Sequence, residues 1–191
     1  MTHSATEKRP GKRELLVESA GELLHRQGVE RTTLAEIAHA ADVPPGNVYY
    51  YFKTRDDLVR AVIDTRAESV QALLTSIERR STPRARLKAL ARSWADVADL
   101  VAANGCPIGS LSSELNKQDT ALAEDAAEVF RLVLDWAEAQ FREMGRKQPG
   151  DLATTLFAGV QGAALLANTL RDPNVLSREM RRLERWIDSL A

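Results

Sequence analysis

The sequence predicts an all-α protein of about nine helices. Three observations support this fold class. Ala, Leu, Glu and Arg, which favour helices, dominate the 191-residue chain, whereas residues that favour strands are few. Apolar residues recur at helical spacing through most of the chain. Gly and Pro interrupt this pattern at intervals that suit helix ends and helix starts.

Composition narrows the class of protein. The chain is 44% apolar and 28% charged, which is ordinary for a soluble globular protein. It has one cysteine, so no internal disulfide can form, as is usual in the cytoplasm. No signal peptide is apparent, and no uninterrupted apolar run approaches the ~20 residues that cross a bilayer. We therefore expect a cytoplasmic protein without a membrane segment.

Residues 32–58 carry the strongest local signal. Thr33 and Glu36 have the spacing of a capping box, which starts a short helix. Two prolines follow, and the residue before a proline is pushed out of the α region, so Val43 must lie beyond the end of that helix. Pro45 suits the first position of a second helix. Two short helices joined by a tight turn form a helix-turn-helix, whose second helix can enter the DNA major groove.

The same stretch resembles the DNA-binding core of the TetR family of bacterial transcriptional regulators. It departs from the family pattern at Asp42, where glycine is usual, and at Pro44, where serine is usual. The resemblance implies an N-terminal three-helix DNA-binding domain and a C-terminal helical domain. The matching positions are Thr33, Ile37, Ala38, Ala41, Val43, Gly46, Tyr49, Tyr51, Phe52 and Leu58.

Side chains on and beside the second short helix are candidates for DNA contacts. The resemblance implies that Tyr49 reaches a phosphate, that Tyr50 faces DNA and that Tyr51 is half-buried. The alternative is a tyrosine cluster that only packs. The expected DNA-binding residues are Thr33, Pro45, Gly46, Asn47, Tyr49, Tyr50 and Lys53.

Charge alone does not favour a nucleic-acid partner. The net charge is −1, and residues 1–60 hold nine basic and nine acidic residues. Affinity depends on the charges that face the phosphates rather than on the total. Lys8, Arg9, Lys12 and Arg13 form a basic cluster that is either a phosphate-binding arm or a solvated tail. We expect the DNA-binding domain to span residues 1–60.

Residues 61–191 are expected to form the ligand-binding and dimerisation domain. Apolar spacing predicts long helices over about 55–79, 83–103, 119–144 and 151–171, and a last helix to about 190. In this last helix, Met180, Leu183, Ile187 and Leu190 step by three and four, as in a coiled-coil seam. A single chain could bury the seam, but the resemblance favours a homodimer through the last two helices. The expected interface residues are Leu156, Gly159, Val160, Ala163, Met180, Leu183 and Ile187.

The resemblance also implies an effector pocket in the C-terminal domain. Its candidate lining is apolar, which favours a small apolar or aromatic effector. Cys106 precedes Pro107, a good first helical position, so its thiol lies where helix amides favour a thiolate. It is either a redox or electrophile sensor or an inert buried residue. The candidate lining residues are Trp94, Cys106, Phe130, Trp136, Phe157 and Gln161.

With these patterns, the resemblance implies a ligand-responsive homodimeric repressor that binds double-stranded DNA at a palindromic operator. An enzyme is disfavoured, because neither a phosphate loop nor a nucleotide-binding or metal-binding pattern is present, and no cofactor or metal is expected. The remaining alternative is a helical adaptor that binds only protein. Binding of the protein to palindromic DNA would favour the repressor, and no binding would favour the adaptor.

Overall fold

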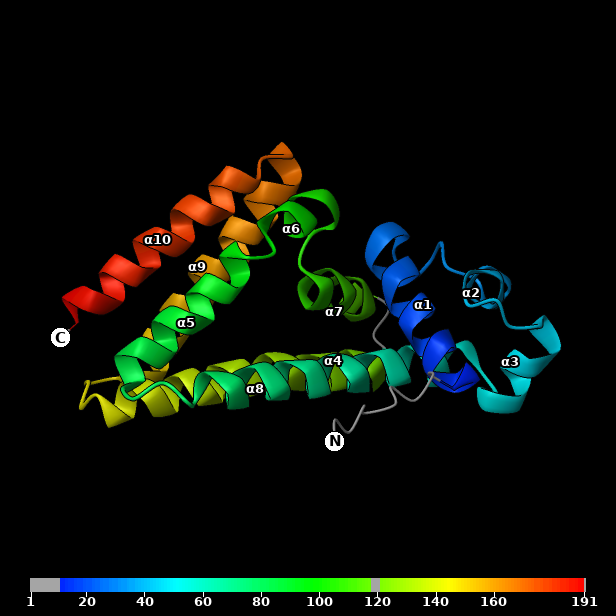
Figure 1. The fold of residues 1–191 in the computed structure, drawn as a ribbon, viewed down its shortest axis with the longest axis horizontal. Coiled ribbons are helices and arrows are strands. Elements are labelled where there is room, and N and C mark those ends of the chain that lie inside the picture. The colour runs from blue at the N-terminus through cyan, green and yellow to red at the C-terminus, as the bar shows by residue number, and fades with distance from the viewer. Residues whose placement is uncertain (1–10, 118–120, 191) are drawn as a thin grey trace, which may run out of the picture. The chain divides into compact units, whose positions relative to one another are not determined.

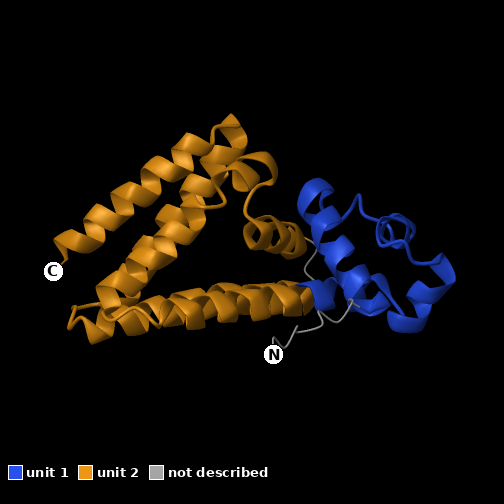
Figure 2. Ribbon diagram, viewed as in Figure 1, with its two compact units in different colours: residues 1–62 blue, residues 63–191 orange. Residues whose placement is uncertain are grey.

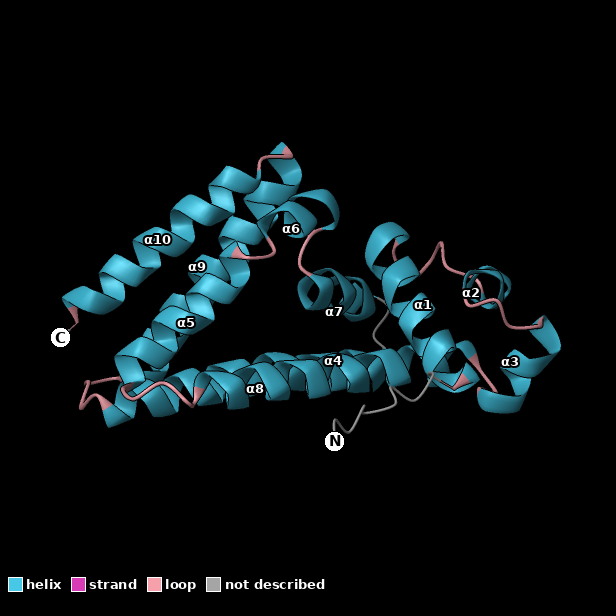
Figure 3. Ribbon diagram, in the orientation of Figure 1, coloured by secondary structure: helices cyan, strands magenta, loops and turns pink. Residues whose placement is uncertain are grey.

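The computed structural model describes residues 11–117 and 121–190, and these residues form ten helices and no strand (Figure 3). Two compact units are present, residues 1–62 and 63–191 (Figure 2). Helix α4 (Arg55–Ile77) begins in the first unit and ends in the second. The expected all-α class is confirmed.

The N-terminal unit holds α1 (Lys12–Gln27), α2 (Leu34–Ala40), α3 (Pro45–Tyr51) and the start of α4. Helix α2 contacts both α1 and α3. Gly28 ends α1 with φ 84°, a value that favours glycine, and its N–H donates to the Leu24 carbonyl at 3.0 Å. Gly28 therefore allows the chain to turn directly after α1.

The C-terminal unit continues α4 and adds six helices (Figure 1). Helix α9 packs against both α8 and α10, and α10 also packs against α5. Buried residues of these helices form one apolar core, which includes Leu87, Phe141 and Leu176. The six helices are α5 (Pro83–Ala95), α6 (Ala98–Asn104), α7 (Pro107–Lys117), α8 (Ala121–Glu143), α9 (Pro149–Leu170) and α10 (Pro173–Ser189).

The expected helix over 83–103 is two helices. It breaks at Val97, whose φ of −112° and ψ of 19° lie outside the helical values. Helix α6 then starts in a new direction and buries Ala98, Val101 and Ala102. Because Leu87 to Val101 reads as a continuous helical pattern, the sequence alone does not show this break. The expected start of α8 at residue 119 lies outside the described residues.

The apolar heptad residues of α10 are buried inside one chain. Six of the seven residues expected at the dimer interface are at most 4% exposed and belong to the core of the C-terminal unit. The seventh, Gly159, is half-buried, and a Cβ on it would lie 3.2 Å from the Leu183 side chain. Within one chain these residues pack into the core of the C-terminal unit, while Gly159 and Ala163 also line a surface groove with Gly162 and Leu166. Their part in a dimer interface stays a prediction. The six are Leu156, Val160, Ala163, Met180, Leu183 and Ile187.

Helix α9 is the one helix of the described residues that is long and apolar enough, by length and composition, to cross a membrane. A search for an uninterrupted apolar run does not find this helix, because Thr, Gly and Gln separate its apolar residues. Seven of its residues, among them Phe157 and Ala164, are buried inside the C-terminal unit. Its apolar character therefore reflects, in part, a core helix.

Replacing Leu183 with alanine should lower the free energy of unfolding by about 2–5 kcal/mol, because it leaves a cavity in the core of one chain. Chemical denaturation at fixed protein concentration measures this change. Leu100→Ala is the matched control: Leu100 is 48% exposed on α6, so its change should stay within about 0.5 kcal/mol. Equal effects of the two substitutions would contradict the internal placement of the seam.

Candidate nucleic-acid interface

Helix α2 starts at a complete capping box. The Glu36 N–H donates to Thr33 Oγ1 at 3.2 Å, and the Thr33 N–H donates to Glu36 Oε2 at 2.9 Å. The Thr33 hydroxyl also donates to Glu36 Oε2 at 2.8 Å. These hydrogen bonds lower the pKa of Glu36 and fix where α2 begins.

The turn between α2 and α3 is sharp. Asp42 has φ 51°, in the left-handed region where the TetR pattern usually has glycine and where aspartate is one of the better tolerated side chains. The Val43 N–H donates back to the Ala38 carbonyl at 2.9 Å. Val43, Ala38 and Ile37 are buried. The departure at Asp42 therefore leaves the tight turn in place.

Helix α3 begins with Pro45 at a first-turn position, and the Pro44 side chain makes no capping bond. Val48 is 1% exposed and Phe52, four residues later, is 3% exposed. Phe52 is the extended cap residue directly after α3, and its N–H donates to the Val48 carbonyl at 2.8 Å. Val48 therefore marks the inward side of α3, and the opposite side points outward. Tyr49 is 58% exposed and Tyr50 is 76% exposed.

The expected DNA-contact residues are exposed, apart from Asn47, which is half-buried. Gly46 is exposed, and a Cβ added there would meet no atom within 4 Å. The Lys53 ammonium donates to the Tyr49 carbonyl at 3.0 Å and so lies beside the end of α3. The exposed members are Thr33, Pro45, Gly46, Tyr49, Tyr50 and Lys53.

Two contacts near α3 were not expected from the sequence. The Arg13 guanidinium lies 5.2 Å from the centre of the Phe52 ring, an arrangement in which a cation favours the ring face. The Tyr50 and Tyr51 rings meet edge to face with centroids 5.0 Å apart. Of the expected basic cluster, Lys8 and Arg9 lie outside the described residues.

Comparison with known families decides the class of protein. Residues 16–62 match the family described as bacterial regulatory proteins, tetR family. Residues 83–182, more than half of the chain, match the C-terminal domain described as transcriptional regulator LmrA/YxaF-like. The chain belongs to the TetR family. It is accordingly a helix-turn-helix transcriptional regulator, and the likeness read from residues 32–58 is confirmed.

Relatives of this TetR-family chain are named as HTH-type transcriptional regulators. An HTH-type transcriptional regulator in the lacX 3' region of Lactococcus lactis is 29% identical over 171 residues, covering 86% of this chain and 87% of that protein. LmrA of Bacillus subtilis is 25% identical over 175 residues, covering 86% and 90%. TtgR of Pseudomonas putida is 36% identical over 63 residues, 33% of this chain and 30% of TtgR.

Solved structures share the fold over nearly the whole chain. A TetR transcriptional regulator from Legionella pneumophila has a TM-score of 0.84 at 20% identity, covering 95% of this chain and 98% of that one. The regulatory protein TetR from Rhodobacter sphaeroides has a TM-score of 0.81 at 25% identity, with coverage of 91% and 97%. The two-part helical architecture is therefore that of the family.

Four of the six candidate effector-pocket residues lie close together. The Gln161 side chain and the Cys106 thiol both lie beside Gly109. Phe157 precedes Gln161 by one turn on α9, and its ring meets Phe130 of α8 with centroids 5.2 Å apart. Trp94 instead packs partly buried against the core. The Trp136 indole N–H donates to Glu78 Oε1 of the segment after α4 at 3.1 Å.

Cys106 is buried at the start of α7. The Gly109 N–H donates to its sulfur at 3.2 Å, as expected for a residue that caps a helix. Burial nevertheless raises the pKa of the Cys106 thiol, and the hydrogen bonds from Gly109 and Ile108 oppose this shift only in part. The thiol is therefore protonated at neutral pH, the opposite of an activated thiolate.

Native Cys106 should react with a maleimide far more slowly than the unfolded chain at pH 7, because the thiol is buried and protonated. Its rate should keep rising with pH beyond the ordinary thiol pKa of about 8.5. Mass spectrometry of timed samples, with and without urea, measures both rates. Equal rates at pH 7 would show that the thiol is accessible and activated.

Proposed function

We propose that this TetR-family regulator is a ligand-responsive homodimeric repressor that binds a near-palindromic operator through α3. The carrying observation is the split of α3 into a buried face and an exposed tyrosine face. Residues 1–60 are proposed as the DNA-binding domain and residues 61–191 as the ligand-binding and dimerisation domain. A relative from Mycobacterium, 26% identical over 164 residues, is named as the transcriptional repressor DhaR.

The exposed tyrosines support contact with DNA. Burying a side chain such as Val48 or Phe52 stabilises a fold by about 1.5–3 kcal/mol, so this pair sets the rotation of α3. Tyr49 and Tyr50 then have no place in the core. Their hydroxyls can bond phosphate oxygens, and their rings can lie against sugars and bases.

Charge around α3 supports a phosphate-facing surface despite the neutral total. Lys53 lies at the end of α3, close to the Tyr49 carbonyl. Near Lys53, the Asp57 carboxylate accepts a hydrogen bond from the Thr54 N–H at 2.9 Å. The Asp57 backbone N–H donates to Thr54 Oγ1 at 3.1 Å. These bonds lower the pKa of Asp57 and hold its carboxylate on the cap of α4.

A second copy of the chain is proposed to cover the outer face of α9. Leu165 and Leu170 are more than 60% exposed, and Leu166 is 53% exposed. Gly162 lies on the same side, and a Cβ there would meet nothing within 4 Å. Glycine in mid-helix costs about 1 kcal/mol relative to alanine, and nothing in its own chain requires it. The missing side chain at Gly162 would allow a helix of the second chain to pack closely against α9.

The effector is proposed to bind near the Cys106, Gln161, Phe157 and Phe130 group. Two aromatic rings beside one amide suit a small aromatic or apolar compound with a single polar group. Such a compound changes DNA affinity only by its difference in affinity for the two states of the dimer. Cys106 here contributes surface rather than redox chemistry.

Tyr49→Ala should weaken operator binding about tenfold, a loss of about 1.4 kcal/mol, as expected for one lost contact to DNA. Lys53→Gln should weaken binding and lower the salt dependence by about one phosphate contact. Electrophoretic mobility shift with DNA from upstream of the gene, over a series of salt concentrations, measures both effects. Lys147→Gln, at an exposed lysine of the C-terminal unit, is the matched control. Unchanged binding by Tyr49→Ala, with the fold intact, would refute the assigned contact.

Leu166→Glu should dissociate the dimer, because a carboxylate buried at the interface loses its hydration without a partner. Sedimentation velocity at micromolar concentration should show single chains for this variant and pairs for the parent. Leu100→Glu, at a comparably exposed leucine of α6, should remain paired. If Leu166→Glu also sediments as pairs, the copies meet through another surface.

A further inference from the structure

A groove of about 890 Å³ lies in the C-terminal unit, away from the residues proposed for the effector. It is bordered by the end of α4, the length of α5, the segment after α8 and the end of α10. Part of its wall is apolar and is built by Ile77, Pro83, Ala89, Met144 and Leu190. It shares no lining residue with the Cys106 and Gln161 group.

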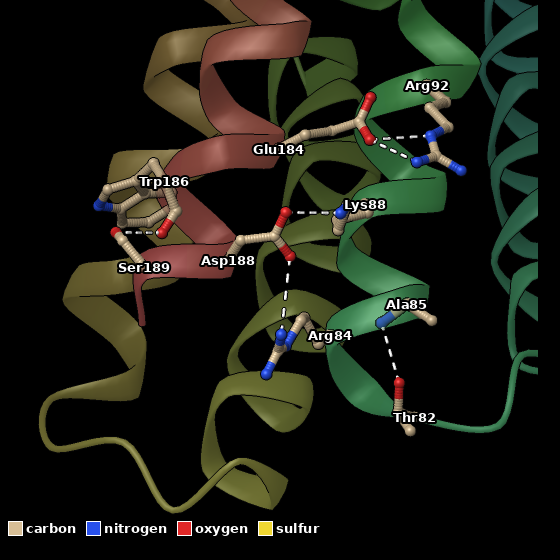
Figure 4. Close-up of polar contacts among 9 residues, drawn as sticks. All are labelled: Thr82, Arg84, Ala85, Lys88, Arg92, Glu184, Trp186, Asp188 and Ser189. Carbon is tan, nitrogen blue, oxygen red and sulfur yellow. Dashed lines mark hydrogen bonds and ion pairs between the residues drawn. The ribbon is translucent and has the colours of Figure 1, made fainter. Parts of the chain in front are cut away.

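The polar wall of the groove carries more positive than negative charge. Lys88 Nζ lies 2.7 Å from Asp188 Oδ2, and Arg84 Nη1 lies 3.8 Å from Asp188 Oδ1, so one carboxylate serves two cations (Figure 4). The basic residues of the lining are Arg80, Arg84, Lys88, Arg92 and Arg146, and the acidic ones are Asp96, Glu143 and Asp188.

The other nearby carboxylates are engaged or distant. Glu143 Oε2 accepts from Arg86 Nη1 at 2.9 Å, and Arg86 does not line the groove. Glu184 accepts two hydrogen bonds from Arg92, at 2.9 and 2.6 Å (Figure 4). Asp96 caps the far end of α5, roughly 18 Å from Arg84 at the rise of an α-helix.

Two cations of the lining are left without a carboxylate. Within residues 11–117 and 121–190, neither Arg80 nor Arg146 has an acidic partner. The Arg146 Nε donates to the Met144 carbonyl at 3.1 Å, which leaves its remaining N–H groups open to a ligand. The Arg80 carbonyl accepts from Arg86 Nε at 3.0 Å, so the backbone at Arg80 is held while its guanidinium is not.

We propose that this groove binds an organic anion: a carboxylate or phosphate head on an apolar body. The head lies between Arg80 and Arg146, with Arg84 nearby, because guanidinium groups bind both kinds of oxyanion through paired N–H donors. The body lies along Ile77, Ala89 and Met144. This site is separate from the proposed effector site and does not depend on DNA binding.

Isothermal titration calorimetry on the full-length chain tests the site with octyl phosphate and octanoate. Either probe should bind, and Arg80→Gln/Arg146→Gln should weaken binding about tenfold or more, as expected for lost charge-assisted hydrogen bonds. The control Arg79→Gln/Lys147→Gln removes two neighbouring cations that do not line the groove, and it should bind as the parent does. Whichever probe binds more tightly identifies the preferred head group.

Octan-1-ol and inorganic phosphate complete the comparison, and both should bind more weakly than the two amphipathic anions. The proposal is overturned if neither anion binds, if octan-1-ol binds as tightly as they do, or if the Arg80/Arg146 variant retains parental affinity. Thermal melting checks that each variant is folded. Arg80→Gln alone, at an exposed position, replaces the double variant if that variant unfolds.

Discussion

The rotation of a seven-residue helix is the constraint on which the function of this protein depends. Val48 and Phe52 lie one turn apart and are almost fully buried, so only one orientation of α3 satisfies both. That orientation turns Tyr49 and Tyr50 to solvent. The capping box at Thr33 fixes where α2 begins, and the left-handed turn at Asp42 leads from α2 into α3. A short helix has little stability of its own, and it therefore takes its direction from these neighbours.

In the C-terminal unit, α10 buries its apolar side chains, whereas the outer face of α9 keeps exposed leucines. The heptad residues of α10 are buried in the core of a single chain, where the Leu183 side chain lies against Gly159 of α9. This leaves Gly162 and the exposed leucines at the end of α9 for the proposed second copy. Helix α4 is continuous across the boundary between the two units, so it links the proposed DNA-binding and ligand-binding domains covalently.

Local chemistry allowed much of the fold to be predicted from the sequence. The capping box, the glycine after α1 and the prolines that begin α3, α5, α7 and α10 are each decided by a few neighbouring residues. The break at Val97 is not, because its apolar neighbours keep a helical spacing on both sides. A heptad pattern shows that a seam is buried but not which chain buries it, so the sequence alone does not place the α10 seam in the core of its own chain. Arg80, Arg84 and Arg146 come from separate segments, and no sequence pattern indicates that they line one groove.

The most direct test of the account is to sequence the genomic DNA fragments that the purified protein retains at physiological salt. The account predicts enrichment of one short, near-palindromic sequence, because two α3 helices related by a twofold axis contact two half-sites. Uniform recovery of genomic fragments, or enrichment of a site without any inverted repeat, would contradict it.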